Sequence, residues 1–154
     1  MIYLLDYGVG NLASLSNTLE FIGCKSQIIQ NPVPLKITDK LILPGVGAFN
    51  YAIDRLNRNE FGNFIQSAFQ QNIKILGICL GMQLFYESSM ENGYHNGLGF
   101  MPGNLTSFKS QDSNLRIPRI GWGEVFFHKS HPVLEGIKQN SYFYFLHSFF
   151  CPIN

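Results

Sequence analysis

The chain has 154 residues, of which 45% are apolar and 14% are charged, and its formal net charge is +1. This length suits one domain with a core of its own, and the low charged fraction argues against disorder. A near-neutral charge without a lysine or arginine cluster argues against nucleic acid or a membrane surface as a partner. The apolar runs are too short for a membrane helix, and the start of the chain lacks the features of a signal peptide.

The first half of the chain predicts alternating strands and helices. Four short apolar runs predict buried strands, at Ile2–Leu5, Ser26–Ile29, Leu41–Leu43 and Ile73–Ile78. Apolar residues at helical spacing predict a helix over 12–22, which Asn11 would cap and Gly23 would end, and a second helix over 61–69. This alternation predicts an α/β fold with an open, mostly parallel sheet and flanking helices, in which ligands bind at the carboxyl ends of the strands.

The second half predicts further strands without strong helices between them. Aromatic and β-branched residues indicate strands at Phe108, Val125–Phe127 and Tyr142–His147. No repeat, low-complexity run or linker interrupts the sequence, so residues 1–154 are expected to belong to one domain.

One glycine motif favours a turn over a nucleotide site. Residues 8–13, Gly-Val-Gly-Asn-Leu-Ala, fit the fingerprint G-x-G-x-x-A of dinucleotide-binding folds. That fingerprint also requires an acidic residue at the end of the next strand, and residues 26–30 contain none. A glycine turn leading into a helix is therefore the favoured interpretation.

The cysteines and histidines predict neither a disulfide framework nor a metal site. Cys24, Cys79 and Cys151 show no paired spacing, which favours a reducing cytoplasm. The histidines lack metal-ligand spacing, and His131 precedes a proline in a polar stretch typical of a surface turn. We therefore expect no bound metal.

The strongest chemical signal is Gly77-Ile78-Cys79-Leu80-Gly81, here called the cysteine elbow. It is the cysteine form of the nucleophile elbow G-x-S-x-G, in which a sharp strand-to-helix turn lifts the nucleophile above the sheet. A helix N-terminus would favour the thiolate, and the N–H of Leu80 would face a developing oxyanion. The alternative is a buried cysteine that acts as a small apolar residue. The strand-then-helix context and the nearby Pro44–Gly47 segment, here called the oxyanion loop, favour the catalytic interpretation.

Several motifs together resemble a known family. They are, in chain order, Asp6–Asn11, Leu43–Phe49, Gly77–Gln83, Gly97–Gly99 and Tyr144–Ser148. Their composition and order are similar to those of the glutaminase subunit of imidazole glycerol phosphate synthase, a class I glutamine amidotransferase. The resemblance runs through all 154 residues and implies a flavodoxin-like α/β fold.

The resemblance also implies a reaction and a partner. A cysteine thiolate would attack the side-chain amide of glutamine, giving a glutamyl thioester and ammonia, and water would then release glutamate. No cofactor is implied. The ammonia would pass through a tunnel to a cyclase barrel subunit, which makes imidazole glycerol phosphate in histidine biosynthesis, and the two subunits would form a cytoplasmic heterodimer.

Site residues follow from the resemblance by position. Cys79 would be the nucleophile, and the oxyanion hole would be formed by Gly45, Val46, Gly47 and Leu80. Glutamine would be held by Gln83, Glu91, His147, Ser148 and Phe149, and the cyclase interface would include Arg116, Arg119 and Trp122. Two of these residues have open alternatives, because Glu91 could be a solvated loop charge and Trp122 could be a core residue.

The chain departs from the family pattern near its predicted partner surface. The family usually has P-H-M-G-W-N at the position of Pro118–Gly123, and a tyrosine at the position of Phe149. A related branch that supplies ammonia for sugar amidation in surface polysaccharide synthesis is therefore an alternative. A stand-alone cysteine hydrolase or redox chaperone on the same elbow is another.

The family's H-P-E motif, with its acid–base histidine and glutamate, lies a few tens of residues beyond the H-S-Y segment. The 154-residue sequence stops before that point, and His131-Pro132-Val133 is not that motif. We therefore expect a domain that lacks its C-terminal part and hydrolyses glutamine poorly by itself. A truncated, noncatalytic chain that at most binds a partner is the corresponding alternative.

Overall fold

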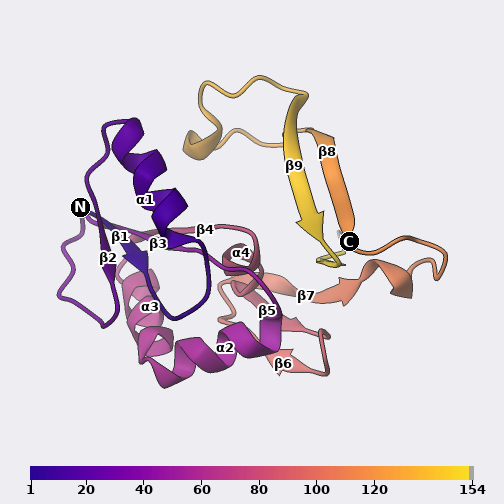
Figure 1. Ribbon diagram of the computed structural model, residues 1–154, viewed down its shortest axis with the longest axis horizontal. Coiled ribbons are helices and arrows are strands. Elements are labelled where there is room, and N and C mark those ends of the chain that lie inside the picture. Colours follow the sequence, from indigo (N-terminus) through magenta and orange to yellow (C-terminus); the bar gives the residue numbers. More distant parts are fainter. Residues whose placement is uncertain (153–154) are drawn as a thin grey trace. The chain divides into compact units, whose positions relative to one another are not determined.

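The computed structural model describes residues 1–152, which form two compact units. The first unit contains residues 1–107 and returns at Phe149, and the second contains Phe108–Ser148 (Figure 1). Among the described residues, no helix has the length and apolar character needed to cross a membrane.

A four-stranded parallel sheet organises the first unit. Its strands are β1 (Ile2–Leu5), β2 (Ser26–Ile29), β3 (Lys40–Leu43) and β4 (Lys74–Gly77), in the order β2-β1-β3-β4. Every neighbouring pair is parallel. The predicted strands and the predicted parallel sheet are therefore confirmed.

Three ten-residue helices accompany this sheet: α1 (Leu12–Phe21), α2 (Phe49–Arg58) and α3 (Phe61–Gln70). Asn11 caps α1 as predicted, since its side-chain oxygen accepts a hydrogen bond from Ser14 N at 3.1 Å, and Gly23 follows with φ +76°. Figure 1 shows α1 on one side of the sheet and α2 and α3 on the other.

The core lies on the side of α2 and α3. These helices bury Phe49, Ala52, Leu56, Phe61, Ile65 and Ala68 against the sheet, whereas α1 has no buried residue. This packing fixes the carboxyl ends of β3 and β4, where the oxyanion loop and the cysteine elbow begin.

A second sheet of the first unit was not predicted. It contains β5 (Tyr86–Ser89), β6 (His95–Asn96), β7 (Met101–Ser107) and β10 (Phe149–Phe150), in the order β10-β7-β5-β6. Two serines, Ser88 and Ser89, are fully buried on β5. Because a strand with buried serines lacks the apolar alternation of a half-buried strand, its pattern gave no signal.

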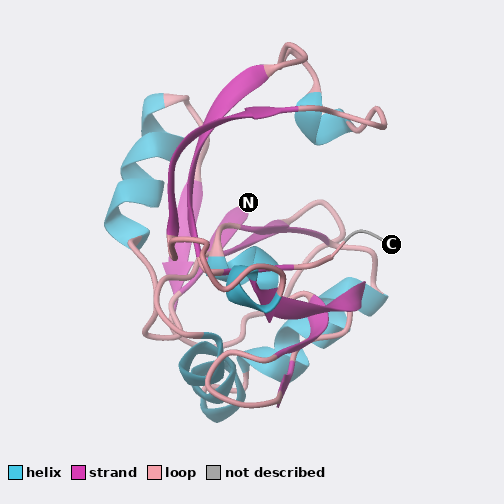
Figure 2. Cartoon of the chain, turned by 90° about the vertical axis from the view of Figure 1, so that its right-hand side faces the viewer, coloured by secondary structure: helices cyan, strands magenta, loops and turns pink. Residues whose placement is uncertain are grey.

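The second unit is built on an antiparallel ribbon of β8 (Arg119–Val125) and β9 (Ser141–His147) (Figures 1 and 2). Short 3₁₀ turns, η1 (Phe108–Ser110) and η2 (Pro132–Leu134), lie outside the ribbon, and the one-turn helix α4 (Leu80–Gln83) belongs to the first unit. The predicted strand at Tyr142–His147 is confirmed. The other two predictions were wrong, since Phe108 lies in η1 and the strand predicted at Val125–Phe127 ends at Val125.

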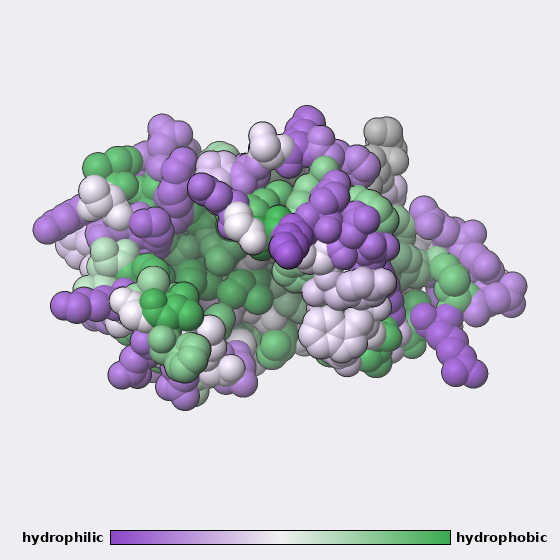
Figure 3. All heavy atoms as spheres, turned by 90° about the horizontal axis from the view of Figure 1, so that it is seen from above, coloured by the Kyte–Doolittle hydropathy of each residue, from purple (hydrophilic) through white to green (hydrophobic). Residues whose placement is uncertain are grey.

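The strand β8 was not predicted from the sequence, because it contains glycines and glycine is depleted in strands. Here Gly121 and Gly123 lie opposite Phe145 and Phe143, and a Cβ on Gly123 would lie 3.2 Å from the Phe145 ring. At Gly123 the missing side chain leaves room for the Arg119 guanidinium and the Phe145 ring, whereas a Cβ on Gly121 would meet nothing within 4 Å. No residue of this unit is buried, and large apolar side chains reach the surface of the protein (Figure 3).

Candidate functional site

The cysteine elbow has the backbone geometry that the motif predicts. The chain leaves β4 at Gly77, and Cys79 adopts φ 54° and ψ −117° before the single helical turn α4 begins at Leu80. A positive φ is costly for a residue with a side chain and persists where the surrounding structure enforces it. The Cys79 side chain is exposed, so the buried-cysteine alternative does not describe this structure.

The two elbow glycines are required by close backbone contacts. A Cβ on Gly77 would lie 2.5 Å from Met82 Cα and 2.6 Å from Met82 N. A Cβ on Gly81 would run into the carbonyl oxygen of Leu43 and lie 2.7 Å from its carbonyl carbon. The elbow is therefore packed on its own helical turn and on the end of β3.

The oxyanion loop lies against the elbow. A Cβ on Gly45 would lie 2.7 Å from Gly81 N and 2.9 Å from Leu80 Cβ, so only a glycine fits there. Gly47 has φ +93°, a conformation that also favours glycine, and Val46 between them is exposed. The structure thus brings together the four residues predicted for the oxyanion hole.

A buried tyrosine supports the oxyanion loop from the end of β1. Tyr7 is fully buried, and its hydroxyl donates a hydrogen bond to the Pro44 carbonyl oxygen at 2.6 Å. Burial raises the pKa of Tyr7 far above its ordinary value, which keeps the hydroxyl protonated as a donor. The sequence alone gives Tyr7 no role, because its partner lies 37 positions away in the chain.

Glu91 is held beside the oxyanion loop by the start of α2. Its Oε2 accepts a hydrogen bond from Phe49 N at 2.9 Å, whereas the N-cap residue Ala48 makes no side-chain cap. The carboxylate thus satisfies a helix N-terminus from 42 positions away, and it is not simply a solvated loop charge. Its other oxygen is the group that the predicted ammonium contact would use.

Gln83 and Phe149 meet in the first unit. The Gln83 side-chain Nε2 donates a hydrogen bond to the Phe149 carbonyl oxygen at 3.2 Å, and β10 pairs Phe149 with Ser107 of β7. Two of the predicted glutamine-binding residues are therefore in direct contact. The remaining two, His147 and Ser148, belong to the second unit, where His147 lies opposite Arg119 at the end of β9.

The predicted interface residues also lie in the second unit. Arg116 and Arg119 are exposed, and the Arg119 guanidinium carbon lies 4.3 Å from the centre of the Phe145 ring. Trp122 is 71% exposed and makes an edge contact with Tyr144 across the ribbon, so it is not a core residue here.

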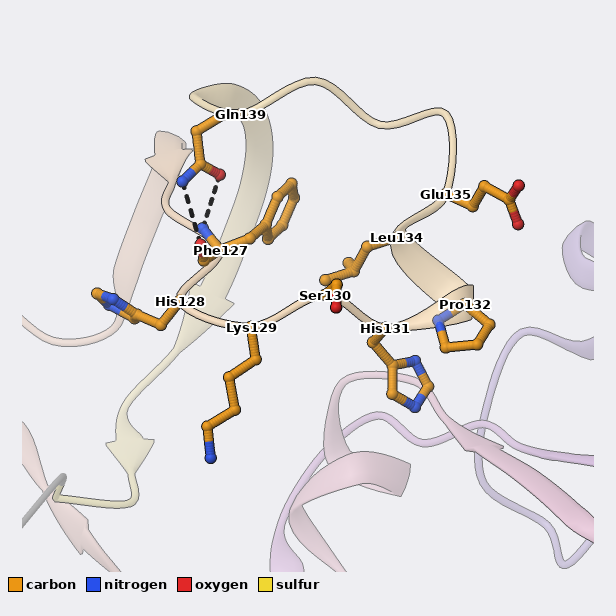
Figure 4. Close-up of a pocket in the computed structure, with 9 residues that line it drawn as sticks. All are labelled: Phe127, His128, Lys129, Ser130, His131, Pro132, Leu134, Glu135 and Gln139. Atoms are coloured by element: carbon orange, nitrogen blue, oxygen red, sulfur yellow. Dashed lines mark hydrogen bonds between the residues drawn. The ribbon is translucent and has the colours of Figure 1, made fainter.

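An open pocket in the second unit contains none of the predicted site residues (Figure 4). Among its lining residues, Gln139 makes two hydrogen bonds with the Phe127 backbone: its Oε1 accepts from Phe127 N at 2.8 Å, and its Nε2 donates to the Phe127 carbonyl oxygen at 3.1 Å. His131 Nδ1 accepts a hydrogen bond from Val133 N at 3.2 Å, so His131 caps η2 at the surface turn that the sequence predicts. Among the described residues, no group of three acidic, histidine or cysteine side chains could hold a metal ion.

Comparisons with known proteins agree with this geometry. The family description "Glutamine amidotransferase class-I" matches residues 3–152. The subunit HisH of imidazole glycerol phosphate synthase from Sulfurimonas denitrificans is 43% identical over 151 residues, covering 97% of this chain and 72% of the relative. The subunit HisH 1 from Campylobacter jejuni is 45% identical, covering 97% and 75%. HisH from Bacillus subtilis is 40% identical over 153 residues, covering 97% and 72%.

Proposed function

Because this chain belongs to the class I glutamine amidotransferases, we propose that it is the glutaminase subunit of an imidazole glycerol phosphate synthase. It would release ammonia from glutamine and supply it to a cyclase barrel subunit in histidine biosynthesis. The partnership would be a heterodimer in the cytoplasm, and the assembled pair would carry the lyase activity. The observation that carries the proposal is an exposed cysteine, held at positive φ, in an elbow whose next residues, Leu80 and Gly81, lie against a glycine-rich loop.

The proposed reaction begins with the Cys79 thiolate. Its sulfur attacks the side-chain carbonyl carbon of glutamine, the S–C bond forms, and an electron pair moves onto the carbonyl oxygen. Backbone N–H groups of the oxyanion loop and of Leu80 would stabilise this charge. Collapse of the intermediate breaks the C–N bond, and the leaving nitrogen takes a proton and departs as ammonia. Water then attacks the thioester, which releases glutamate and restores the thiol.

The head of glutamine carries both an ammonium and a carboxylate. Glu91 is a suitable partner for the ammonium, because one carboxylate oxygen is already fixed by Phe49 N–H. The Gln83 side chain donates a hydrogen bond to the Phe149 carbonyl oxygen and would contact the same amino-acid head of glutamine. The backbone at His147, Ser148 and Phe149 would bind the other end of the glutamine molecule.

The direct test uses residues 1–154 followed by a family-type C-terminal segment that contains the H-P-E motif, combined with the cyclase subunit of a relative such as Campylobacter jejuni. Without that segment we expect little glutamate release, because the acid–base histidine is missing. With it, we expect glutamate release that depends on the cyclase, and formation of imidazole glycerol phosphate from glutamine. Activity with external ammonia but none with glutamine would contradict the proposal. Glutamate release without any effect of the cyclase would point to a different acceptor.

A prediction for Glu91 separates substrate binding from helix capping. Glu91→Gln keeps an oxygen that can accept from Phe49 N but removes the charge. We expect the KM for glutamine to rise roughly 30-fold or more, because the ammonium loses its charged partner. The free energy of unfolding should change by less than about 1 kcal/mol, the usual value of a charge at a helix N-terminus.

The matched control is Glu87→Gln, since the Glu87 Oε2 also accepts a backbone hydrogen bond, from Gly103 N at 3.0 Å. We expect that variant to leave KM unchanged. Glu91→Ala should add a loss of about 1 kcal/mol in stability, because the N-terminus of α2 then has no cap. If Glu91→Gln had the wild-type KM, the substrate-binding role would be contradicted and Glu91 would act only as a helix cap.

A second prediction concerns the partner surface. Trp122→Ala is expected to lower cyclase affinity by about 2 kcal/mol, because exposed tryptophans anchor interfaces with large apolar area. The free energy of unfolding of the free chain should change by less than about 1 kcal/mol, since Trp122 is largely exposed and its ring makes an edge contact with Tyr144. Titration calorimetry and denaturant unfolding measure the two effects.

The control is Phe126→Ala, another exposed aromatic residue of the same unit, which should leave affinity unchanged. Loss of folding without a separate loss of affinity would contradict the interface role.

A further inference from the structure

We propose that Tyr7 is a positioning residue for the oxyanion loop: its hydroxyl sets the orientation of the Pro44–Gly45 peptide, whose N–H would be one of the loop's donors to the oxyanion. This inference rests on the proposed glutaminase function. It adds a residue outside the predicted site, on the loop that follows β1.

The first argument is the planarity of the peptide bond. The Pro44 carbonyl and the Gly45 N–H belong to one rigid plane and point in opposite directions. The Tyr7 hydroxyl holds that carbonyl at 2.6 Å inside the core. Fixing the carbonyl therefore fixes the direction of the N–H as well.

The second argument is that the peptide is confined on two sides. A Cβ on Gly45 would lie 3.0 Å from Tyr7 Oη and 2.7 Å from Gly81 N of the elbow. A Cβ on Gly10 would lie 3.0 Å from Pro44 Cβ, so the β1 loop packs closely on this segment. Tyr7 and the elbow thus enclose the first peptide of the oxyanion loop.

Tyr7 is itself held from α2. The Arg55 Nε donates a hydrogen bond to the Tyr7 carbonyl oxygen at 3.3 Å. A Cβ on Gly8 would lie 2.6 Å from a terminal nitrogen of Arg55, so Gly8 leaves room for this guanidinium. The hydroxyl is therefore an anchored donor, and electrostatic stabilisation of an oxyanion depends on donors that are oriented before reaction.

The test uses L-glutamate γ-semialdehyde, in which an aldehyde replaces the amide of glutamine. The Cys79 sulfur adds to its carbonyl carbon, the π electron pair moves to oxygen, and no group leaves. The reversible adduct imitates the tetrahedral intermediate. We expect Tyr7→Phe to weaken this adduct about tenfold to a hundredfold, because the oxyanion donors lose their fixed orientation. Alkylation of Cys79 by iodoacetamide forms no oxyanion, so its rate should change less than about twofold.

The matched control is Tyr3→Phe, which also removes one hydroxyl from a tyrosine of the first unit, on β1. It should leave both measurements at the wild-type value, and circular dichroism checks that each variant is folded. A second variant carries 3-fluorotyrosine in place of Tyr7, which keeps a more acidic hydroxyl. It should bind the aldehyde at least as tightly as wild type, and weaker binding would overturn the proposal.

The experiment separates a failure of the proposed glutaminase function from a failure of the proposed role of Tyr7. If the wild-type chain does not bind the aldehyde, the proposed function fails and the role of Tyr7 fails with it. If the wild-type chain binds and folded Tyr7→Phe binds equally tightly, only the role of Tyr7 is overturned. An equal loss of aldehyde binding and iodoacetamide rate would show a general distortion of the elbow, which also contradicts a specific effect on the oxyanion.

Discussion

Cys79→Ser is expected to abolish covalent labelling by a glutamine-like electrophile and to lower cyclase-dependent glutamate release by roughly 10⁴-fold or more. The elbow presents the Cys79 sulfur at the surface, at the start of a helical turn and beside the oxyanion loop. A serine hydroxyl in the same place is a much weaker nucleophile without a base that removes its proton. Mass spectrometry of the labelled peptides and a coupled glutamate assay measure the two effects.

The other cysteines supply the controls for this result. Cys24 lies just beyond α1, and its backbone N–H donates to the Leu19 carbonyl at 2.8 Å. Cys151 is partly buried, and a Cβ on Gly103 would lie 2.5 Å from its sulfur. Neither lies at an elbow, so Cys24→Ser and Cys151→Ser should retain wild-type labelling and activity. Labelling of either residue to the same extent as Cys79 would contradict the assignment.

Local sequence patterns predicted the parts of the fold that form from neighbouring residues. The four parallel strands, the Asn11 cap and the elbow all follow from short stretches with characteristic spacing. The helix α2 was missed although its buried Phe49, Ala52 and Leu56 have helical spacing, because its start carries no local cap residue: Ala48 makes no side-chain cap, and the capping Glu91 comes from a distant loop. The strand β5 was missed because its buried positions are serines, one of which, Ser88, donates to Asn104.

The same distinction holds for the candidate site. Cys79 and its glycines could be predicted because a strand–turn–helix motif is contiguous in the sequence. The support around them is assembled from distant segments: Tyr7 binds Pro44, and Gln83 binds Phe149, 66 positions away. No pattern in a single sequence reports such pairs, since each depends on the folded sheet. The sequence therefore predicts the nucleophile and its turn, whereas the residues that orient them are found only in the folded structure.

Gly81→Ala is expected to disrupt the elbow itself. The added methyl group would run into the carbonyl oxygen of Leu43 and lie 2.7 Å from its carbonyl carbon. These are backbone atoms at the end of a core strand, so they cannot move aside as a flexible side chain would. We expect a loss of about 3 kcal/mol or more in the free energy of unfolding, together with loss of Cys79 labelling.

The control for this prediction is a glycine whose neighbour can yield. A Cβ on Gly62 in α3 would meet Asn57 Oδ1 at 2.9 Å, the far end of a flexible side chain. Gly62→Ala should therefore be tolerated and could add about 0.5–1 kcal/mol of stability, because alanine is the better helix former. Denaturant unfolding of both variants, with labelling of Cys79 in each, makes the comparison.

If Gly81→Ala were as stable as Gly62→Ala and were labelled at the same rate, the elbow would not depend on contact with β3. The packing of the nucleophile against the oxyanion loop would then have to be explained by other residues.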